Sequence, residues 1–179
     1  AAAYQAYFEH MPIRPSLWRS MASPRLYRGV DWGELASLSM LDTRQFRSNP
    51  PCAAPSVARN VRLDHCAERL APDRTMLGQA QEAWLADGLK ASTRAGTRWQ
   101  VLVQQVLMGN LNTPAGLADA LPKSMPDALR QRLVAGSMAS AAGIPFNMDA
   151  WDGYPAARKR VFDAALAADA NLVVLAGDT

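Results

Sequence analysis

Several features that mark particular classes of protein are scarce or absent in this sequence. The 179 residues include only two histidines and two cysteines, which form no cluster with the spacing of zinc ligands. No apolar run approaches the roughly 20 residues that a membrane-spanning helix needs. There is also no internal repeat. The sequence therefore argues against a zinc site and against a transmembrane segment within this chain.

Lysine is also scarce, because nearly all of the basic residues are arginine. The arginines are spread along the chain and the net charge is only +3, so the sequence shows no patch typical of nucleic-acid binding. Most of these arginines are expected to be solvated surface side chains. A few also suit a site for anionic substrates, because a guanidinium can contact two phosphate oxygens at once.

The composition is that of an ordinary globular domain, with 49% hydrophobic and 20% charged residues. The length suits one domain with a core and is too short for two. The sequence begins at Ala1 without an initiator methionine or a signal-peptide pattern, and it ends directly after a strand-like run. We therefore expect an internal piece of a longer chain, whose targeting segment would lie before residue 1.

The two cysteines, Cys52 and Cys66, fall in the same loop-like region. A disulfide between them requires Cα atoms within about 7 Å. Closing this short loop would stabilise the fold by ~3 kcal/mol in the chain-entropy model. Such a bridge favours an oxidising compartment such as the periplasm or the cell exterior. Two reduced and unrelated thiols are the alternative.

The pattern of apolar residues and breakers predicts an α/β or layered α+β fold. In order, it predicts a short helix stopped by Pro12, a hairpin of strands over 25–30 and 34–41, a long loop over 48–74, a helix over 75–91, a strand over 101–106, a short helix over 126–135, a helix within 151–170 and a strand over 172–176. Thr75 is the expected N-cap of the second helix. The two later strands are continuously apolar, so we expect them to be buried on both faces.

Polar side chains stand at the carboxyl ends of three predicted strands, where ligands gather in α/β sheets. Asp178 follows the last strand, Gln104 and Gln105 lie near the end of the central one, and Asp42 and Arg44 follow the hairpin. Each has a structural alternative. Asp178 can be a turn former or an N-cap, the glutamines can be satisfied buried amides, and Asp42 and Arg44 can form a strand-end ion pair. Together they predict a site.

Six blocks, taken in order, resemble the alkaline phosphatase D (PhoD-like) family of metallophosphatases. They are AYFEHMPIRP, LASLSMLDTRQFRS, RTMLGQAQEAWL, RWQVLVQQVLM, WDGYPAARKRVFDAA and NLVVLAGDT. The resemblance spans residues 6–179, and the loops around 48–70 and 109–148 contribute little to it. It implies that residues 1–179 are a single C-terminal portion of the catalytic domain. It also implies an incomplete metallophosphatase-type α+β sandwich, cut at both ends.

The resemblance implies hydrolysis of phosphate mono- or diesters with calcium and iron as metal ions, in a periplasmic or secreted protein. The terminal strand of the family runs into Gly-Asp-x-His, and Gly177 and Asp178 match its first two residues. Asp178 is therefore expected to be a metal ligand. Gln104 lies where related metallophosphatases commonly carry a strand-end histidine, and it is a second candidate ligand. Arg44 is the candidate for phosphate binding, held by Asp42.

Two other functions would explain parts of this pattern. Phosphatases of the haloacid dehalogenase type also end a strand in Gly-Asp-Thr to hold magnesium, but they need an early Asp-x-Asp motif that is absent here. The chain can also be a non-catalytic binding module with a decayed metal site. A histidine after Thr179 and an Asp-Asp-His-Glu loop before residue 1 would distinguish the enzyme from the module. In either case we expect the isolated chain to be inactive.

Overall fold

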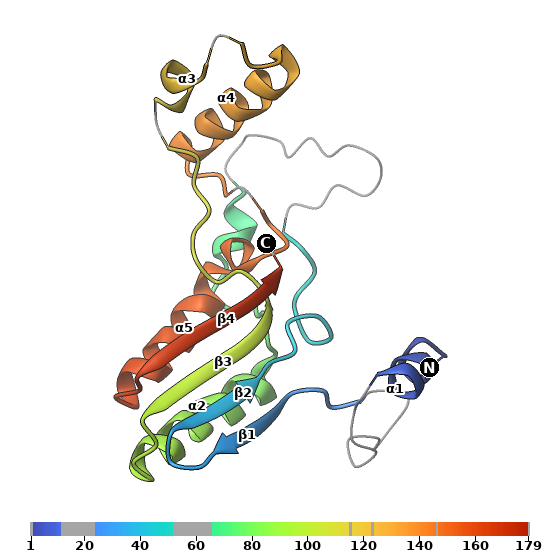
Figure 1. The fold of residues 1–179 in the computed structure, drawn as a ribbon, viewed down its shortest axis with the longest axis vertical. Helices are drawn as coiled ribbons and strands as arrows, with labels where there is room; N and C mark the ends of the chain where they lie inside the picture. The colour runs from blue at the N-terminus through green and yellow to red at the C-terminus, as the bar shows by residue number, and fades with distance from the viewer. Residues whose placement is uncertain are drawn as a thin grey trace.

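The computed structural model describes residues 2–11, 24–51, 66–114, 116–122, 124–145 and 147–178. Its elements are α1 (Ala2–His10), β1 (Arg28–Trp32), β2 (Ala36–Met40), η2 (Ala67–Leu70), α2 (Gln79–Arg94), β3 (Trp99–Val106), α3 (Leu117–Ala120), α4 (Asp127–Ala141), η3 (Trp151–Gly153), α5 (Pro155–Ala167) and β4 (Leu172–Asp178). The four strands form one sheet in the order β1-β2-β3-β4 (Figure 1). The predicted α/β class is confirmed.

The first two strands form the predicted hairpin, with different boundaries. Residues 33–35 make the turn, which is closed by the Leu35 N–H donating to the Trp32 carbonyl at 3.1 Å. Gly33 has φ +55°, in the left-handed region that glycine adopts without a Cβ clash. The return strand therefore starts after the turn, at Ala36. β2 then pairs in parallel with β3, and β3 in parallel with β4.

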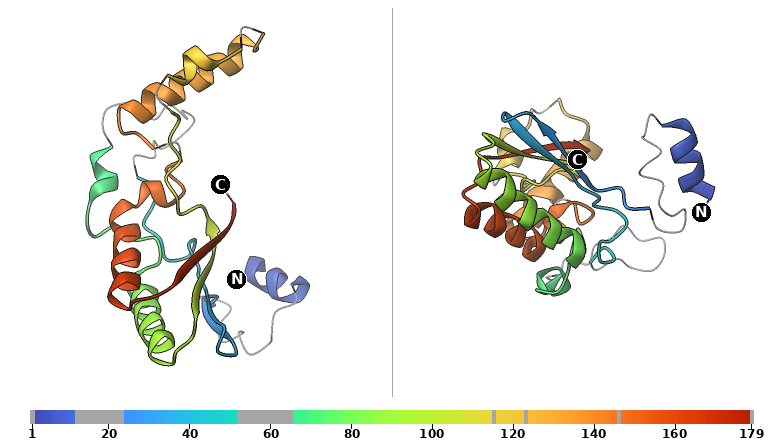
Figure 2. Two further views of the ribbon diagram at one scale, coloured as in Figure 1. Left: turned by 60° about the vertical axis from the view of Figure 1, so that its left-hand side comes forward. Right: turned by 90° about the horizontal axis from the view of Figure 1, so that it is seen from below.

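The prediction that both later strands are buried on both faces is wrong. α2 and α5 lie side by side on the same face of the sheet (Figure 2). Along β3, Gln100, Leu102, Gln104 and Val106 are buried, whereas the residues between them are half-exposed or exposed. An apolar sequence allows a strand to be buried on both faces, but it does not show which elements pack against each face.

The face away from α2 and α5 is apolar across all four strands, and we call it the open face. The register places on it Val30, Trp32, Leu38, Met40, Trp99, Val101, Val103, Val173 and Leu175. Each of these side chains is half-exposed or exposed. Trp32 is the most exposed large apolar residue of the set, at 71%.

The core lies between the sheet and the two long helices. The last helix and its C-cap contribute a buried stripe to the core, formed by Ala157, Val161, Ala165 and Ala168. Opposite them, α2 contributes Leu85 and Leu89, and β3 contributes Leu102. None of the described helices is both long enough and apolar enough to cross a membrane.

The start of α2 differs from the prediction. Thr75 does not cap the helix; its hydroxyl oxygen accepts hydrogen bonds from the N–H groups of Leu77 and Gly78, at 3.2 and 2.8 Å. Gly78 has φ +74°, which no right-handed helix allows, so the helix starts only at Gln79. Thr75 therefore closes a turn just ahead of the helix. Ala80, in the first turn of the helix, is exposed.

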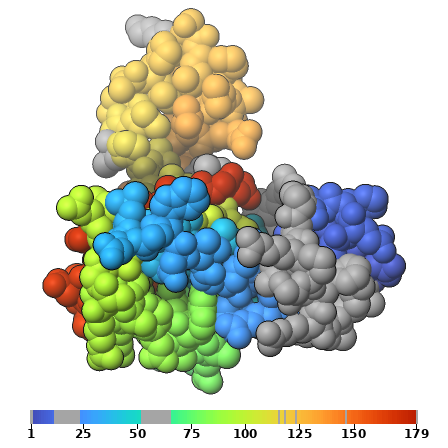
Figure 3. Space-filling model, turned by 60° about the horizontal axis from the view of Figure 1, so that its bottom comes forward, coloured from blue at the N-terminus to red at the C-terminus, as the bar shows by residue number. Residues whose placement is uncertain are grey.

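Residues 116–141 form a lobe that stands apart from the sheet and its helices (Figure 3). Leu117–Ala120, expected as loop, is the short helix α3, and α4 continues to Ala141 rather than ending near residue 135. Gly136 does not end the helix, because its φ is not positive there and the helical backbone continues through it. No described side chain of α4 is fully buried.

The chain enters α5 through the tight turn η3, not through a continuous helix from Trp151. Pro155 stands at the first helical position, where its missing N–H costs nothing. Gly153 packs so closely that a Cβ there would lie 2.1 Å from the carbonyl oxygen of Met148. Only glycine allows the two backbone segments to approach this closely.

Replacing Gly153 by alanine is expected to lower the free energy of unfolding by about 2 kcal/mol or more, because the added Cβ forces the backbone near Met148 to move. Gly88 in α2 is the matched control, since a Cβ there meets nothing within 4 Å. Alanine at Gly88 should raise stability by about 0.5–1 kcal/mol. Urea unfolding of the two purified variants measures both changes, and a Gly153→Ala variant as stable as the unmodified protein would contradict the expectation.

Candidate functional site

The polar residues predicted at strand ends meet at one edge of the sheet. β2, β3 and β4 are parallel, so their carboxyl ends lie together (Figure 1). Gln104 pairs with Ala176 and Val106 with Asp178 across the last two strands. Arg44 reaches this edge from the loop after β2, and its Nη2 lies 3.9 Å from Asp178 Oδ2. The three predicted site residues are therefore neighbours along this edge.

Residues 42–47 form the loop that follows β2, and Asp42 organises it from within. Asp42 is buried, and its Oδ1 accepts hydrogen bonds from the N–H groups of Arg44 at 2.9 Å and Gln45 at 3.0 Å. Its Oδ2 accepts a hydrogen bond from the Gln45 side chain. Asp42 thus holds Arg44 through the backbone, which leaves the Arg44 guanidinium for other partners.

Gln105 ties the 42–47 loop to the central strand. Its Oε1 accepts hydrogen bonds from both the N–H and the hydroxyl of Thr43, at 2.9 and 2.6 Å. Its Nε2 donates to the Leu41 carbonyl at 3.0 Å. The Gln105 side chain thus continues the hydrogen bonding between β3 and the chain beyond Met40, where β2 has ended. These hydrogen bonds fix the position at which the loop leaves the sheet.

Gln81 holds the same loop from the helix side. Its Oε1 accepts from the Asp42 N–H at 2.8 Å, and its Nε2 donates to the carbonyls of Asp42 and Leu77, each at 2.9 Å. Sequence reasoning missed Gln81, although a signal was present. It is a polar residue spaced four from Leu77 and Leu85 on the apolar side of the helix, and a buried amide there must have partners.

Arg44 and Arg47 converge on one carboxylate, that of Asp149, and we call these three residues the Asp149 cluster. Arg44 Nη1 lies 2.5 Å from Asp149 Oδ2, and Arg47 Nη1 lies 2.7 Å from Asp149 Oδ1. Burial raises the pKa of Asp149, but the hydrogen bonds and the positive charges of the two guanidiniums together lower it by more, so this pKa lies below its ordinary value. Asp149 is therefore ionised at neutral and alkaline pH.

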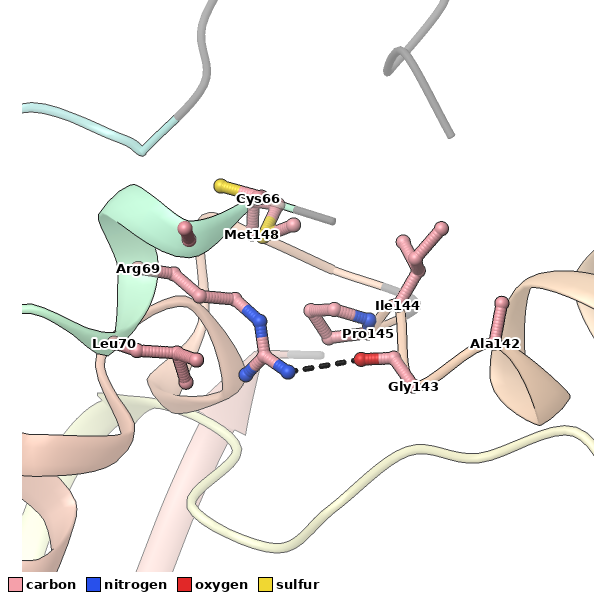
Figure 4. A pocket seen from close by; sticks show the side chains of 9 residues that line it. Cys66, Arg69, Leu70, Ala142, Gly143, Ile144, Pro145 and Met148 are labelled. Carbon is pink, nitrogen blue, oxygen red and sulfur yellow. Dashed lines mark hydrogen bonds between the residues drawn. The ribbon is translucent and has the colours of Figure 1, made fainter. Parts of the chain in front are cut away.

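The segment that carries Asp149 is anchored on both sides. Before it, Arg69 of η2 donates to the Gly143 carbonyl at 2.8 Å, beside a small cavity of about 120 Å³ between η2 and residues 142–148 (Figure 4). Within it, the Asp149 N–H donates to Asn147 Oδ1 at 2.8 Å. After it, the buried Trp151 donates from Nε1 to Gln104 Oε1 at 3.0 Å. The position of Asp149 is thus set by contacts with η2 and β3.

Gln104 is buried and its amide is engaged within the protein. Besides Trp151, its Oε1 accepts from the Val106 N–H at 3.2 Å, and its Nε2 donates to the Val106 carbonyl. The structure thus gives Gln104 the partners of a satisfied structural amide. A role as a metal ligand stays a prediction.

The WDGYPAAR block serves the architecture around the site. Asp152 is buried, lies 2.7 Å from Arg158 and accepts a hydrogen bond from the Leu111 N–H at 3.0 Å. Two residues further on, Arg160 meets both carboxylate oxygens of Glu82 in α2, at 2.7 and 2.9 Å. The Arg160 ion pair connects α5 to α2, and Asp152 links α5 to the loop after β3 through its contacts with Arg158 and the Leu111 N–H.

Metal binding requires more ligands than this edge contains. The Asp178 carboxylate, with its side chain 67% exposed, is a hard oxygen donor of the kind that calcium takes. Across the described ranges there is no group of three His, Cys, Asp or Glu side chains that could hold a metal ion. Calcium takes six to eight oxygen ligands, so the described residues supply at most part of a metal site.

The predicted disulfide is not tested by this structure. Cys66 precedes η2 and is buried. Cys52 lies outside the described residues, as does His65. The pairing of Cys52 with Cys66 therefore stays a prediction.

With this geometry in place, known proteins identify the family. The family model of PhoD-like phosphatases matches residues 1–179. The chain belongs to the PhoD-like phosphatase family. The resemblance drawn from the six sequence blocks is thereby confirmed.

Two relatives show how much of a PhoD-like protein this chain represents. It is 36% identical to alkaline phosphatase D of Bacillus subtilis (strain 168) over 179 residues, which is 99% of this chain and 25% of that protein. A solved structure of PhoD superposes with a TM-score of 0.70 at 34% identity, covering 99% of this chain and 28% of the other. The PhoD-like chain thus spans about a quarter of the length of these relatives.

Proposed function

We propose that a full-length protein carrying this chain hydrolyses phosphate mono- or diesters with the help of metal ions. The observation that carries the proposal is the 36% identity to an alkaline phosphatase over 99% of the chain. The arrangement at the sheet edge is compatible with it, because a guanidinium and a carboxylate stand 3.9 Å apart there. An anionic ester and a cation can be bound side by side at such an edge.

Two residues of this chain take part directly in the proposed reaction. Arg44 contacts the phosphate, since a guanidinium can bind two phosphate oxygens at once. Asp178 supplies one carboxylate to calcium or iron, and the remaining ligands come from outside the part of the chain that the structure describes. A metal ion bound there neutralises phosphate charge and makes a bound water more acidic. Gln104 is a further candidate ligand if its amide exchanges the Trp151 contact for a metal.

The role of the other named residues is to hold Arg44 in place. Asp42 binds the backbone of Arg44, and Gln105 and Gln81 hold the loop on its two sides. Since these hydrogen bonds come from the loop itself, from β3 and from α2, they hold the backbone of residues 42–44 in one position. A pre-positioned group loses less conformational entropy when the substrate binds.

We also propose a periplasmic or secreted location, with a disulfide between Cys52 and Cys66. An oxidising compartment would allow the bridge to persist, and the bridge would close the loop ahead of η2. Thiol labelling of the unfolded protein before and after reduction tests the bridge. Labelling of both cysteines without reductant would overturn it.

Metal removal is the sharpest test of the proposed function. Chelation of a full-length protein carrying this chain should lower its hydrolysis of p-nitrophenyl phosphate and bis(p-nitrophenyl) phosphate by about 100-fold or more, because the charge that neutralises the phosphate is lost. Adding back calcium and iron should restore turnover, whereas magnesium alone should not. Full activity after chelation would contradict metal dependence. A metal-loaded protein that hydrolyses neither ester would support the non-catalytic binding module instead.

A further inference from the structure

We propose that Asp149 sets the preference between phosphate monoesters and diesters by cancelling one of the two positive charges of Arg44 and Arg47. The inference rests on the proposed function. Asp149 is a positioning and charge-setting residue, since it acts through the arginines and not on the reacting atoms. Its two carboxylate oxygens are each taken by one guanidinium, at 2.5 and 2.7 Å.

The Asp149 cluster lies close enough to Asp178 for its charges to interact with an ester bound at the sheet edge. Arg44 stands between two carboxylates, with Nη1 on Asp149 and Nη2 3.9 Å from Asp178. An ester held near Asp178 therefore meets the Arg44 guanidinium first. Asp149 is 46% exposed and Arg47 only 18%, so solvent reaches the carboxylate more readily than the second guanidinium. Asp149 contacts Arg44 directly, and Arg47 contacts the other oxygen of the same carboxylate.

The net charge of the cluster matches a diester better than a monoester. Two guanidiniums and one carboxylate leave a single positive charge. A phosphate monoester carries nearly two negative charges above its second pKa of about 6, whereas a diester carries one. Removing the Asp149 charge would raise the cluster to two positive charges. With an effective dielectric constant between that of a protein surface (about 20) and that of water (about 80), one additional unit interaction across about 5 Å changes binding by about tenfold.

The contacts around the Asp149 cluster should allow its charge to be changed by substitution without a change in the backbone. The 42–47 loop is held by Gln81 and Gln105 independently of Asp149. The segment of Asp149 is held by Asn147 and by the Trp151 contact with Gln104. An isosteric substitution at Asp149 should therefore leave both backbones in place.

Two substitutions test the proposal. Both break the ion pair between Arg47 and Asp149, but they should change the preference between the two esters in opposite directions. In a full-length protein carrying this chain, Asp149→Asn should raise the ratio of kcat/KM for p-nitrophenyl phosphate to that for bis(p-nitrophenyl) phosphate by about tenfold. Arg47→Gln should lower the same ratio by about tenfold, because it removes a positive charge instead. Both changes should appear mainly in KM, since the ester carries its charge before the reaction begins. Structural damage would instead move the ratio in the same direction in both variants, or leave it unchanged.

Controls separate charge from packing. Asp149→Glu keeps the charge, so its ratio should stay within about twofold of the unmodified value. Asp163→Asn makes the same chemical change in α5, where Asp163 pairs with Lys159 in an exposed i,i+4 contact, and should leave the ratio unchanged. An unchanged ratio in Asp149→Asn, with normal turnover, overturns this inference alone. An unmodified, metal-loaded protein that hydrolyses neither ester overturns the proposed function and this inference with it.

Discussion

Replacing Asp178 by asparagine in a full-length protein carrying this chain should lower its phosphatase activity by about 100-fold or more. The substitution keeps the shape of the side chain and removes the charge that makes it a strong ligand for a hard cation. Folding should be nearly unaffected, because the Asp178 side chain is 67% exposed at the end of an edge strand. The measurements are kcat/KM, the bound metal per protein and the thermal unfolding midpoint.

A matched control is available in the same sheet. Asp31 lies in β1, is exposed, and accepts a hydrogen bond from the Ser37 hydroxyl at 2.8 Å. Asp31→Asn makes the same change away from the carboxyl ends of the parallel strands, so activity and metal content should remain as in the unmodified protein. Near-normal activity of Asp178→Asn with unchanged metal content would refute the role of Asp178. A loss of activity in both variants would point to a general effect of charge.

The isolated 179-residue chain should show no hydrolysis of a chromogenic phosphodiester above background. The reason is the number of ligands, since the described residues contain no group of three that could hold a metal ion. Weak metal binding by Asp178 alone would not neutralise a phosphate. The experiment is to purify the chain, add calcium and iron, and compare its turnover with that of a full-length PhoD-like protein. Turnover of similar size would show that catalytic ligands lie among residues assigned here to the architecture.

The same chain should also expose apolar surface and self-associate. The open face carries apolar side chains from all four strands, and Trp32, Trp99 and Leu175 on it are more than two-fifths exposed. Contiguous apolar surface of this kind promotes association in water. We expect binding of a hydrophobic dye such as ANS and a sedimentation profile that depends on concentration.

Paired substitutions distinguish the open face from the core. Leu175→Gln on the open face should reduce dye binding and self-association without loss of the fold. Leu102→Gln on the helix side, where the side chain is fully buried, should unfold the chain, because a buried amide without partners costs several kcal/mol, about 2–7 by transfer data. A monomeric chain that binds no dye before any substitution would contradict the expectation.

The sequence by itself determined those elements whose signals are local. The hairpin was visible because Gly33 allows the turn and apolar residues flank it. The last helix was visible because Pro155 starts it and a buried stripe of small apolar residues follows at helical spacing. The family was visible because several short blocks occur in one order, and the match of the family model over residues 1–179 agrees. Asp178 and Arg44 were found as candidates because both lie within three residues after the end of a predicted strand.

Only the tertiary structure decided which residues surround these candidates. Arg44 and Asp149 are separated by 105 positions, and Arg47 contacts the same residue from 102 positions away. The periodicity of apolar residues cannot connect residues so far apart in the sequence, because it shows only which face of a single helix or strand is buried. The register and the anchored segment before η3 bring them together. Likewise, the apolar letters of β3 and β4 could not show that α2 and α5 cover only one face, since coverage depends on where the helices pack.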